Sequence, residues 1–202
     1  MNNEQNSDIS AGLERRDTAE PGRWIDGKLP ANVQLGSSSI ITSDYAFKRF
    51  HSKLNPALII GDRCTMDGVH FAIGEKGYIK TGHYCYFTNA VLLCELEIEI
   101  GDYVVIGWNT TIADTDFHPI APAERVADSI ACSPLGKNRT RPEIVRKKVF
   151  IEDDVWIGPN ATILKGVHIG AGAFIEAGTL VVSDIPPRAR VIGNPAQIIG
   201  KV

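Results

Sequence analysis

The sequence predicts an all-β fold, a parallel β-helix, and two observations carry this prediction. Residues 151–186 read as six consecutive blocks of six: IEDDVW, IGPNAT, ILKGVH, IGAGAF, IEAGTL and VVSDIP. Every block opens with an aliphatic residue, and its fifth position is nearly always small or aliphatic. A period of six fits neither the 3.6-residue period of a helix nor the alternation of a plain strand. It fits short strands separated by turns, in which stacked coils bury a continuous apolar column.

Each residue type has a place in such a coil. The opening residue of each block is expected to point into the core, and the fifth to fill the tight inner corner. The predicted core residues are Ile151, Ile157, Ile163, Ile169, Ile175 and Val181. Glycines fit turns where the backbone needs a positive φ or a close approach, here Gly158, Gly166, Gly170, Gly172 and Gly178.

The six blocks resemble the hexapeptide repeat of the left-handed β-helix acyltransferases, and the resemblance covers about residues 58–200. It is strongest to the galactoside and maltose O-acetyltransferases of that family. It implies a left-handed parallel β-helix, three blocks to each triangular coil, and a homotrimer. We therefore expect an N-terminal extension with an irregular first coil over 1–57, the left-handed β-helix over 58–187, and a C-terminal cap over 188–202.

The rest of the sequence agrees with this division into an extension, a β-helix and a cap. Clean blocks also open at Ile100, Ile106 and Ile112, but the 39 residues from Ile112 to Ile151 are not a multiple of six. Residues 119–148 are therefore expected to leave the helix as an excursion loop, and long loops in compact domains are often functional. Residues 1 to about 30 are poor in large apolar side chains, which predicts a loosely ordered extension that docks on a neighbour. The Gly-Asn-Pro-Ala run at 193–196 resembles the segment that closes the helix end in the family.

Composition excludes several classes of function. The chain has 202 residues and a net charge of −3, so nothing points to nucleic acid or an anionic membrane. No apolar run approaches the ~18 residues of a membrane span, so we expect no transmembrane segment. The N-terminal stretch is polar and lacks an apolar signal core, which predicts a cytoplasmic protein. The four cysteines form no CxxC pair, and we expect reduced thiols and no metal.

His118 is the main catalytic candidate. It lies in IADTDFHPI, where the helical wall meets the excursion loop, and the resembled sugar acetyltransferases have their catalytic histidine at this point. Acyl transfer from a thioester to a hydroxyl needs a base, and imidazole, with an ordinary pKa near 6.5, suits that task. Asp114 and Asp116 flank it, and either could fix the imidazole tautomer or bind an acceptor hydroxyl. Turn formation is an equal alternative for both.

The resemblance adds Asn89 to a catalytic set of His118, Asp116 and Asn89. In YFTNAVLL it matches the asparagine that contacts the acceptor in galactoside and maltose acetyltransferases. The alternative is a turn or stacked asparagine inside a coil. His51, His70, His83 and His168 are expected to be structural or exposed.

Acetyl-CoA is the co-substrate that the resemblance implies. Trp156 matches a tryptophan beside the cofactor, or packs in a trimer interface. Gly158 leaves room beside the thioester, and Ala177 and Gly178 match the family's Ala-Gly pair under the cofactor. Pro159 departs from the family, because the galactoside enzymes donate a backbone N–H to the developing oxyanion there and proline has none. Another donor, such as the Gly158 amide, would be needed.

The phosphates of coenzyme A need cations. Ser183 and Gln197 occupy positions where the family often has lysine and arginine. The cations close by in the sequence are expected to substitute, with solvated surface charge as the alternative for each: Lys165, Arg188, Arg190 and Lys201.

These features predict an acetyl-CoA-dependent O-acetyltransferase that acts on a hydroxyl of a sugar or polysaccharide precursor by direct, histidine-assisted transfer. An amino-sugar N-acetyltransferase and a non-catalytic hexapeptide-repeat scaffold are the alternatives. A zinc-dependent carbonic anhydrase of the same fold is disfavoured, because no two histidines lie within ten residues of each other.

Overall fold

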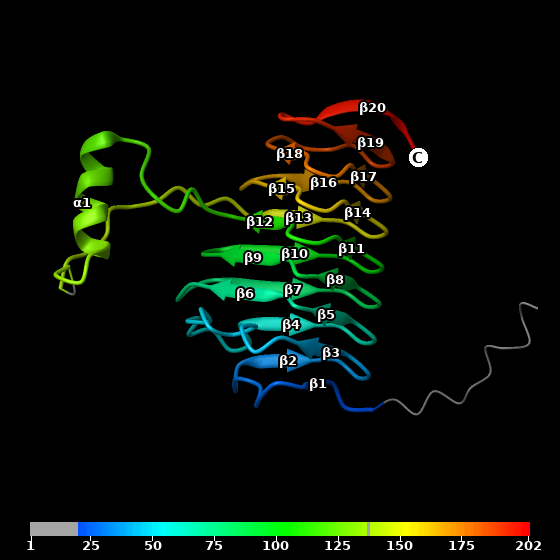
Figure 1. Cartoon of the computed structure of the whole chain (residues 1–202), viewed down its shortest axis with the longest axis horizontal. Helices are drawn as coiled ribbons and strands as arrows, with labels where there is room; N and C mark the ends of the chain where they lie inside the picture. The colour runs from blue at the N-terminus through cyan, green and yellow to red at the C-terminus, as the bar shows by residue number, and fades with distance from the viewer. Residues whose placement is uncertain (1–19, 137) are drawn as a thin grey trace, which may run out of the picture.

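The computed structural model describes residues 20–136 and 138–202, which form a left-handed parallel β-helix of about eight turns. Figure 1 shows the coils stacked along one axis, with the C-terminal strands at one end. The chain visits three sheets in turn, which we call sheets A, B and C. Sheet A has nine strands, in the order β1 (Arg23–Trp24), β3 (Ile40–Thr42), β5 (Thr65–Asp67), β8 (Tyr86–Thr88), β11 (Val105–Ile106), β14 (Trp156–Ile157), β17 (Phe174–Ile175), β19 (Ala189–Ile192) and β20 (Gln197–Lys201).

The other two sheets complete the triangular cross-section. Sheet B has six strands, in the order β16 (His168–Ile169), β13 (Val149–Ile151), β10 (Glu97–Ile100), β7 (Tyr78–Thr81), β4 (Leu58–Ile60) and β2 (Val33–Leu35). Sheet C has five, in the order β18 (Leu180–Val181), β15 (Thr162–Ile163), β12 (Thr111–Ala113), β9 (Val91–Cys94) and β6 (His70–Ile73). All pairs between successive coils are parallel; only β20 runs antiparallel, to β19.

The six-residue period sets the core. Ile151, Ile157, Ile163, Ile169, Ile175 and Val181 are all fully buried, which confirms that each block opens inward. Equivalent positions stack in register, as Ile112 pairs with Ile163 and Ile163 with Val181. The fifth positions Val155, Ala161, Val167 and Ala173 are also buried at the corners.

The coils extend further toward the N-terminus than the sequence indicates. β1, β2 and β3 already stack on the following coils, so residues 23–42 belong to the β-helix and not to an extension. Residues 43–57 then form a loop without a helix, in which Phe50 bridges to Ile73. The predicted extension falls mainly on residues 1–19, outside the described residues.

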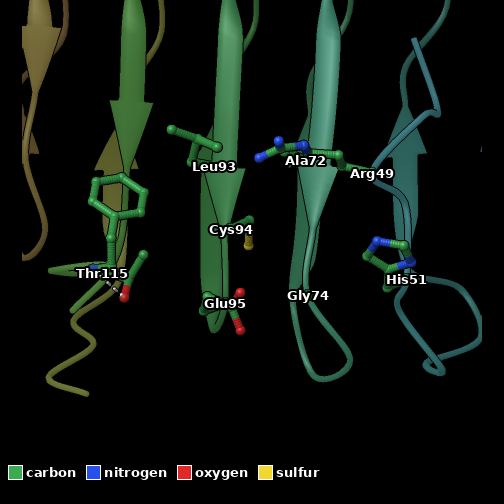
Figure 2. Close-up of a pocket in the computed structure, with 9 residues that line it drawn as sticks. Arg49, His51, Ala72, Gly74, Leu93, Cys94, Glu95 and Thr115 are labelled. Atoms are coloured by element: carbon green, nitrogen blue, oxygen red, sulfur yellow. Dashed lines mark hydrogen bonds between the residues drawn. The ribbon is translucent and has the colours of Figure 1, made fainter. Parts of the chain in front are cut away.

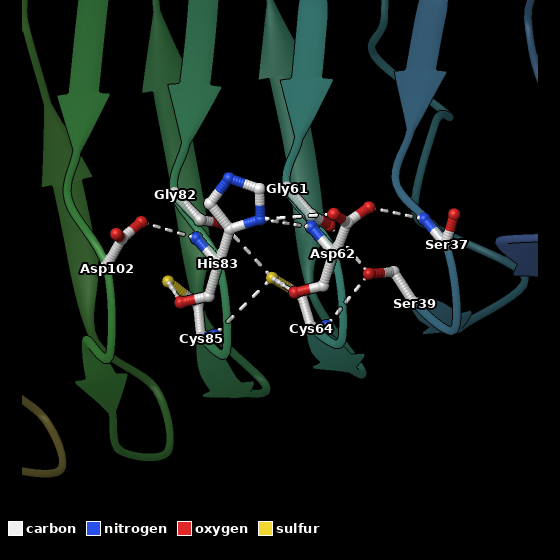
Figure 3. Close-up of polar contacts among 9 residues, drawn as sticks. All are labelled: Ser37, Ser39, Gly61, Asp62, Cys64, Gly82, His83, Cys85 and Asp102. Carbon is white, nitrogen blue, oxygen red and sulfur yellow. Dashed lines mark hydrogen bonds and ion pairs between the residues drawn. The ribbon is translucent and has the colours of Figure 1, made fainter. Parts of the chain in front are cut away.

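The polar side chains at the corner between sheets B and A link one coil to the next. The carboxylates of Asp62 and Asp102 accept the backbone N–H groups of Ser37 and His83 at 2.7 Å, and Nδ1 of His83 accepts the N–H of Asp62 at 3.0 Å (Figure 3). Cys64 and Cys85 lie buried in the same corner as free thiols. This corner is structural and lies apart from the excursion.

The excursion leaves after β12 through a short neck. Thr115 and Arg146 form an antiparallel bridge, and the Asp116 N–H donates to the Val145 carbonyl at 3.1 Å. Beyond the neck lies one element that we did not predict, the helix α1 (Pro122–Cys132). It begins at a proline, a residue whose missing N–H is harmless in the first turn. Figure 1 shows α1 standing well away from the coils.

Candidate active site

His118 lies where the excursion neck ends, and its partner comes from the helix α1. Its Nδ1 is 2.5 Å from Oδ2 of Asp128, which is fully buried although the imidazole is 60% exposed. No described residue contacts Nε2 through a hydrogen bond. An acceptor oxygen on Nδ1 fixes the tautomer with its proton there, so the exposed Nε2 is left free to take a proton.

Arg141 holds the carboxylate in place from the irregular segment by which the excursion returns to the coils. Its Nε donates to Oδ1 of Asp128 at 2.6 Å, and its Nη2 donates to the Phe117 carbonyl at 2.8 Å. The hydrogen bond from Arg141, followed by that with His118, lowers the pKa of Asp128 to about 2. Asp128 is therefore an anion at all pH values at which an enzyme is normally assayed.

Asp114 has a structural role instead of orienting the imidazole. It is fully buried, and its carboxylate accepts the backbone N–H groups of the turn after β9, from Glu95, Leu96 and Glu97, at 2.7–2.8 Å. Burial, and after it the Asp114 charge, raises the pKa of the neighbouring Cys94 thiol. The suggestion that Asp114 fixes the histidine tautomer is therefore wrong, because its oxygens face the coil.

Asp116 also has a partner other than the imidazole. Its Oδ1 lies 2.5 Å from Nζ of Lys165, at the corner that follows β15, and its Oδ2 is buried without a partner among the described side chains. The backbone carbonyl of Asp116 accepts the His118 N–H at 2.7 Å. This ion pair links the start of the neck to the next coil. It joins Asp116, which we predicted in the catalytic set, to Lys165, which we predicted at the phosphates of coenzyme A.

The histidine stands between two cavities. One, of about 360 Å³, is lined by Asp116, His118, Pro119 and Glu143, among others. The other, of about 220 Å³, is lined by Glu95, Phe117, His118 and Arg141, among others. A substrate hydroxyl can therefore approach the imidazole from either side of the neck.

Asn89 lies at a different corner, between sheets A and C. Asn89, Asn109 and Asn160 occupy equivalent left-handed positions in successive coils, with φ of 47°, 59° and 58°. Asn89 donates to Asn109 at 2.8 Å, so it belongs to a ladder of stacked asparagines. Sheet C separates this corner from His118, and the structure does not bring Asn89 and His118 together within one chain.

The predicted cofactor residues gather at the Asn89 corner and on the adjoining sheet A. Trp156 is half-buried on β14, and its ring centroid lies 6.2 Å from that of Phe174. A side chain at Gly158 would lie 2.6 Å from the Ala177 nitrogen, so stacking itself requires glycine there. Ala177 and Gly178 are exposed, and Gly178 has φ of +70° with open space where a Cβ would stand.

The Gly158 amide cannot serve as the oxyanion donor that we suggested. Its N–H donates to the Ile175 carbonyl at 2.8 Å within the coil. Pro159 has no N–H to give. Both positions that the sequence suggested are thereby excluded as donors.

The predicted phosphate-binding cations lie toward the C-terminal end. Arg188 donates to the Val202 carbonyl at 3.1 Å and Arg190 to Glu176 at 2.7 Å, with the Arg190 guanidinium over the Phe174 ring. Lys201 is exposed on β20 and has no ion pair among the described residues. Lys165 lies apart from these three and pairs with Asp116.

Comparison with known proteins agrees with the fold and the repeat. The profile of the bacterial transferase hexapeptide family, six repeats, matches residues 148–183. A hexapeptide-repeat containing acetyltransferase of Vibrio cholerae is 33% identical, with a TM-score of 0.55, over 68% of this chain and 69% of its own. The chain belongs to the hexapeptide-repeat acyltransferases.

Two galactoside acetyltransferases are also similar to this chain, which covers a smaller share of their length than of the Vibrio cholerae enzyme. The galactoside O-acetyltransferase of Lactococcus lactis is 34% identical over 145 residues, which are 71% of this chain and 62% of that protein. A galactoside acetyltransferase solved in complex with coenzyme A is 31% identical with a TM-score of 0.53, over 66% of this chain and 58% of its own. The chain thus spans somewhat less than two thirds of these relatives.

The sequence did not reveal the partners of His118. Asp128 and Arg141 lie in the excursion, which carries no six-residue phase, and they follow His118 by 10 and 23 positions. The helical spacing within PAERVADSIAC was the one signal that could have placed Asp128 on a helix face. Within 20–136 and 138–202, no cluster of three histidine, cysteine or acidic side chains could hold a metal ion, and no helix is long and apolar enough to cross a membrane.

Proposed function

We propose that this hexapeptide-repeat protein is an acetyl-CoA-dependent O-acetyltransferase that acetylates a hydroxyl of a sugar or polysaccharide precursor. The observation that carries the proposal is the His118–Asp128 pair, a buried anion 2.5 Å from Nδ1 of an exposed imidazole beside two cavities. The similarity to galactoside acetyltransferases supports the reaction class and a sugar acceptor.

In this proposal His118 is the general base. Asp128 keeps the proton on Nδ1 and stabilises the imidazolium that forms when Nε2 takes the proton of the acceptor hydroxyl. Arg141 acts through Asp128, since its two hydrogen bonds hold the carboxylate ionised and fix the neck at Phe117. Acetyl-CoA, when bound, supplies the acetyl group as a thioester. The protonated His118 is then placed to return its proton to the departing thiolate.

The residues at the Asn89 corner fit coenzyme A. Gly178 leaves open space at an exposed turn, and Ala177 beside it is small, so an extended chain can lie flat there. Trp156 would lie beside the pantetheine arm of coenzyme A, and Lys201, Arg188 and Arg190 would face the phosphates. Lys201 is the one of these three cations without a hydrogen-bond or ion-pair partner among the described residues, so it is the first candidate for a phosphate contact. We assign no residue to the oxyanion.

The two half-sites support a homotrimer with shared active sites. His118 lies beyond one end of the sheet C strands and Ala177, Gly178 and Asn89 lie at the other, so one chain does not join them. The excursion, which Figure 1 shows extending away from the coils, also has four exposed apolar residues: Ile120, Val126, Ile130 and Leu135. Such residues fit contact with a neighbouring copy. We therefore propose that the excursion of one copy covers the Asn89 corner of the next copy, which holds Ala177 and Gly178 and which we call the cofactor corner.

The proposed location of the protein is the cytoplasm. The proposed role is a step in polysaccharide biosynthesis. The cysteines of the described residues are all free thiols, which suits a reducing compartment.

The test of the function is acetyl transfer. The full chain is incubated with acetyl-CoA and a panel of mono- and disaccharides, amino sugars and sugar nucleotides, and thiol release and acetylated product are both measured. We expect transfer to a sugar hydroxyl by the wild type and almost none by His118→Ala. Transfer to amino groups only would make the protein an N-acetyltransferase, and coenzyme A binding without any transfer would favour a scaffold.

A further inference from the structure

A groove leads away from His118 along the ends of the sheet C strands. The cavity of about 220 Å³ beside His118 shares Glu95, Thr115 and Phe117 with a second cavity of about 330 Å³. The second cavity continues past Gly74 to Arg49 and His51. Figure 2 shows these residues on three successive segments, with Glu95 at the end of β9, Gly74 at the end of β6, and His51 on the segment beyond β6. The shared lining residues show that the two cavities adjoin, and together they extend from the His118 imidazole to a cationic end at Arg49 and His51.

The cationic end is fixed in place. The Ile73 N–H donates to the Arg49 carbonyl at 3.1 Å, and the His51 N–H donates to the Ile73 carbonyl at 2.7 Å, so this segment pairs with β6 like an added strand. Beneath it, Phe47 stacks on Phe71 with centroids 5.8 Å apart. Arg49 is thus presented from an anchored backbone, although it lies in a loop.

The charges at this end are free to meet an anion. The Arg49 guanidinium has no hydrogen bond or ion pair among the described residues, and in Figure 2 it extends over Ala72 toward Leu93. Glu75 lies near His51 but is paired with Lys53 at 2.9 Å. The nearby His70 does not add charge, because burial, and after it Arg49 and Lys48, lower its pKa. Glu95 is the acidic group that faces the groove, between His118 and Arg49.

Phe117 provides an apolar surface in the shared part of the groove. It is 38% exposed and has φ of 64°, a left-handed conformation that is costly for a bulky residue and that clusters at ligand sites. Arg141 holds it there through its carbonyl. An exposed aromatic face packs well against the C–H face of a sugar ring.

We propose that this groove binds an anionic saccharide, with its carboxylate or phosphate on Arg49 and His51. The reacting hydroxyl lies at His118, the ring packs on Phe117, and Glu95 accepts hydrogen bonds from other hydroxyls. The segment of Arg49 lies three strands from β12, a distance of about 14 Å at ~4.8 Å per strand. The Arg49 side chain extends back over part of this distance. The anionic group therefore lies on a neighbouring sugar or an extended substituent. The proposal rests on the proposed acetyl transfer and names its acceptor class.

The test compares three disaccharides that differ at one carbon: neutral, carboxylate and phosphate monoester. Their binding to the full chain is measured by calorimetry without acetyl-CoA, and then their acetylation is measured. We expect one anionic form to bind more tightly than the neutral one, and the preferred form identifies the anion. Arg49→Gln should weaken that form 10- to 100-fold, the worth of a charged hydrogen bond, and leave the neutral form unchanged. Lys48→Gln removes an adjacent exposed charge outside the groove and should change neither.

The outcomes separate this inference from the proposed function. Equal binding of all three disaccharides, or an equal loss for all three in Arg49→Gln, would overturn the anionic site even if acetyl transfer occurs. Preferential, Arg49-dependent binding without any transfer would support the site and overturn the acetyltransferase. Higher salt should weaken only the anionic forms, because screening acts on the charge.

Discussion

Oδ2 of Asp128 lies 2.5 Å from Nδ1 of His118, and the two residues come from different parts of the excursion, ten positions apart. Asp128 is fully buried and the imidazole is mostly exposed. A buried anion behind an exposed base is an arrangement that orients the ring without competing for the substrate.

Replacing His118 with alanine should lower kcat by ~10²–10⁴, the usual worth of a positioned proton transfer. Coenzyme A should still bind, because the proposed cofactor residues lie at another corner. Steady-state acetyl transfer and calorimetric coenzyme A affinity check both parts. Loss of transfer together with loss of cofactor binding would make His118 a positioning residue.

Asp128→Asn should lower kcat by roughly 10² or more, because asparagine no longer selects the tautomer with a free Nε2. The double variant His118→Ala, Asp128→Asn should be no worse than His118→Ala alone, since Asp128 acts through the ring. Asp116→Asn is the matched control and should cost less, because Asp116 pairs with Lys165. An additive double variant would contradict the pairing.

The low pKa of Asp128 predicts how stability changes with pH. Because hydrogen bonds from Arg141 and His118 lower that pKa from 3.8 to about 2, the ionised carboxylate stabilises the folded chain. The contribution is fully present above the ordinary value and is lost as pH falls through about 2. The melting-temperature difference between wild type and Asp128→Asn should therefore shrink as pH falls below about 4. A difference that stays unchanged down to pH 2 would show that Arg141 and His118 do not lower the pKa of Asp128.

The core register predicts a contrast at one position. Ile163→Asp buries an unpaired carboxylate in the apolar column and should destabilise the chain by more than about 4 kcal/mol, or prevent folding. Ile163→Val removes one methyl group and should cost about 1 kcal/mol. Chemical denaturation of both variants tests this, and similar midpoints would mean that position 163 does not face the core.

The fold could be predicted because the six-residue period acts on every coil alike. A shift of one residue would turn an isoleucine such as Ile163 outward, so the repeat in the sequence reports the register directly. The first coils were missed because residues 23–42 lack the clean six-residue repeat, although their strands are as short as those of the later coils.

The site could be predicted only in part. His118 could be proposed because the repeat shows where the chain leaves the coils, and the resembled acetyltransferases have their catalytic histidine at that point. Asp128 and Arg141 reach it through the fold of an irregular excursion, and nothing in local spacing brings them together. Asp114 and Asp116 are closer to His118 in sequence. However, the carboxylate of Asp114 accepts hydrogen bonds from backbone N–H groups, and that of Asp116 pairs with Lys165.

The last prediction concerns assembly. We expect a homotrimer, with a mass three times the 22.0 kDa of one chain by light scattering. His118→Ala removes the base, and Ala177→Trp should block the cofactor corner at an exposed position without disturbing the core. Each variant alone should be nearly inactive. Co-expressed with different tags and purified through both, mixed trimers should regain roughly one third of wild-type activity, because one of three shared sites is intact in either composition.

The same experiment distinguishes shared sites from sites within one chain. If each chain carried a complete site, every chain in a mixed trimer would hold one defect, and no site would be intact. Mixed trimers of two differently tagged His118→Ala chains provide the control for reactivation by the tags or by purification, and they should stay inactive. Inactive mixed trimers of the two different variants, with normal mass and melting temperature, would contradict the arrangement in which the His118 of one copy faces the Ala177 corner of the next.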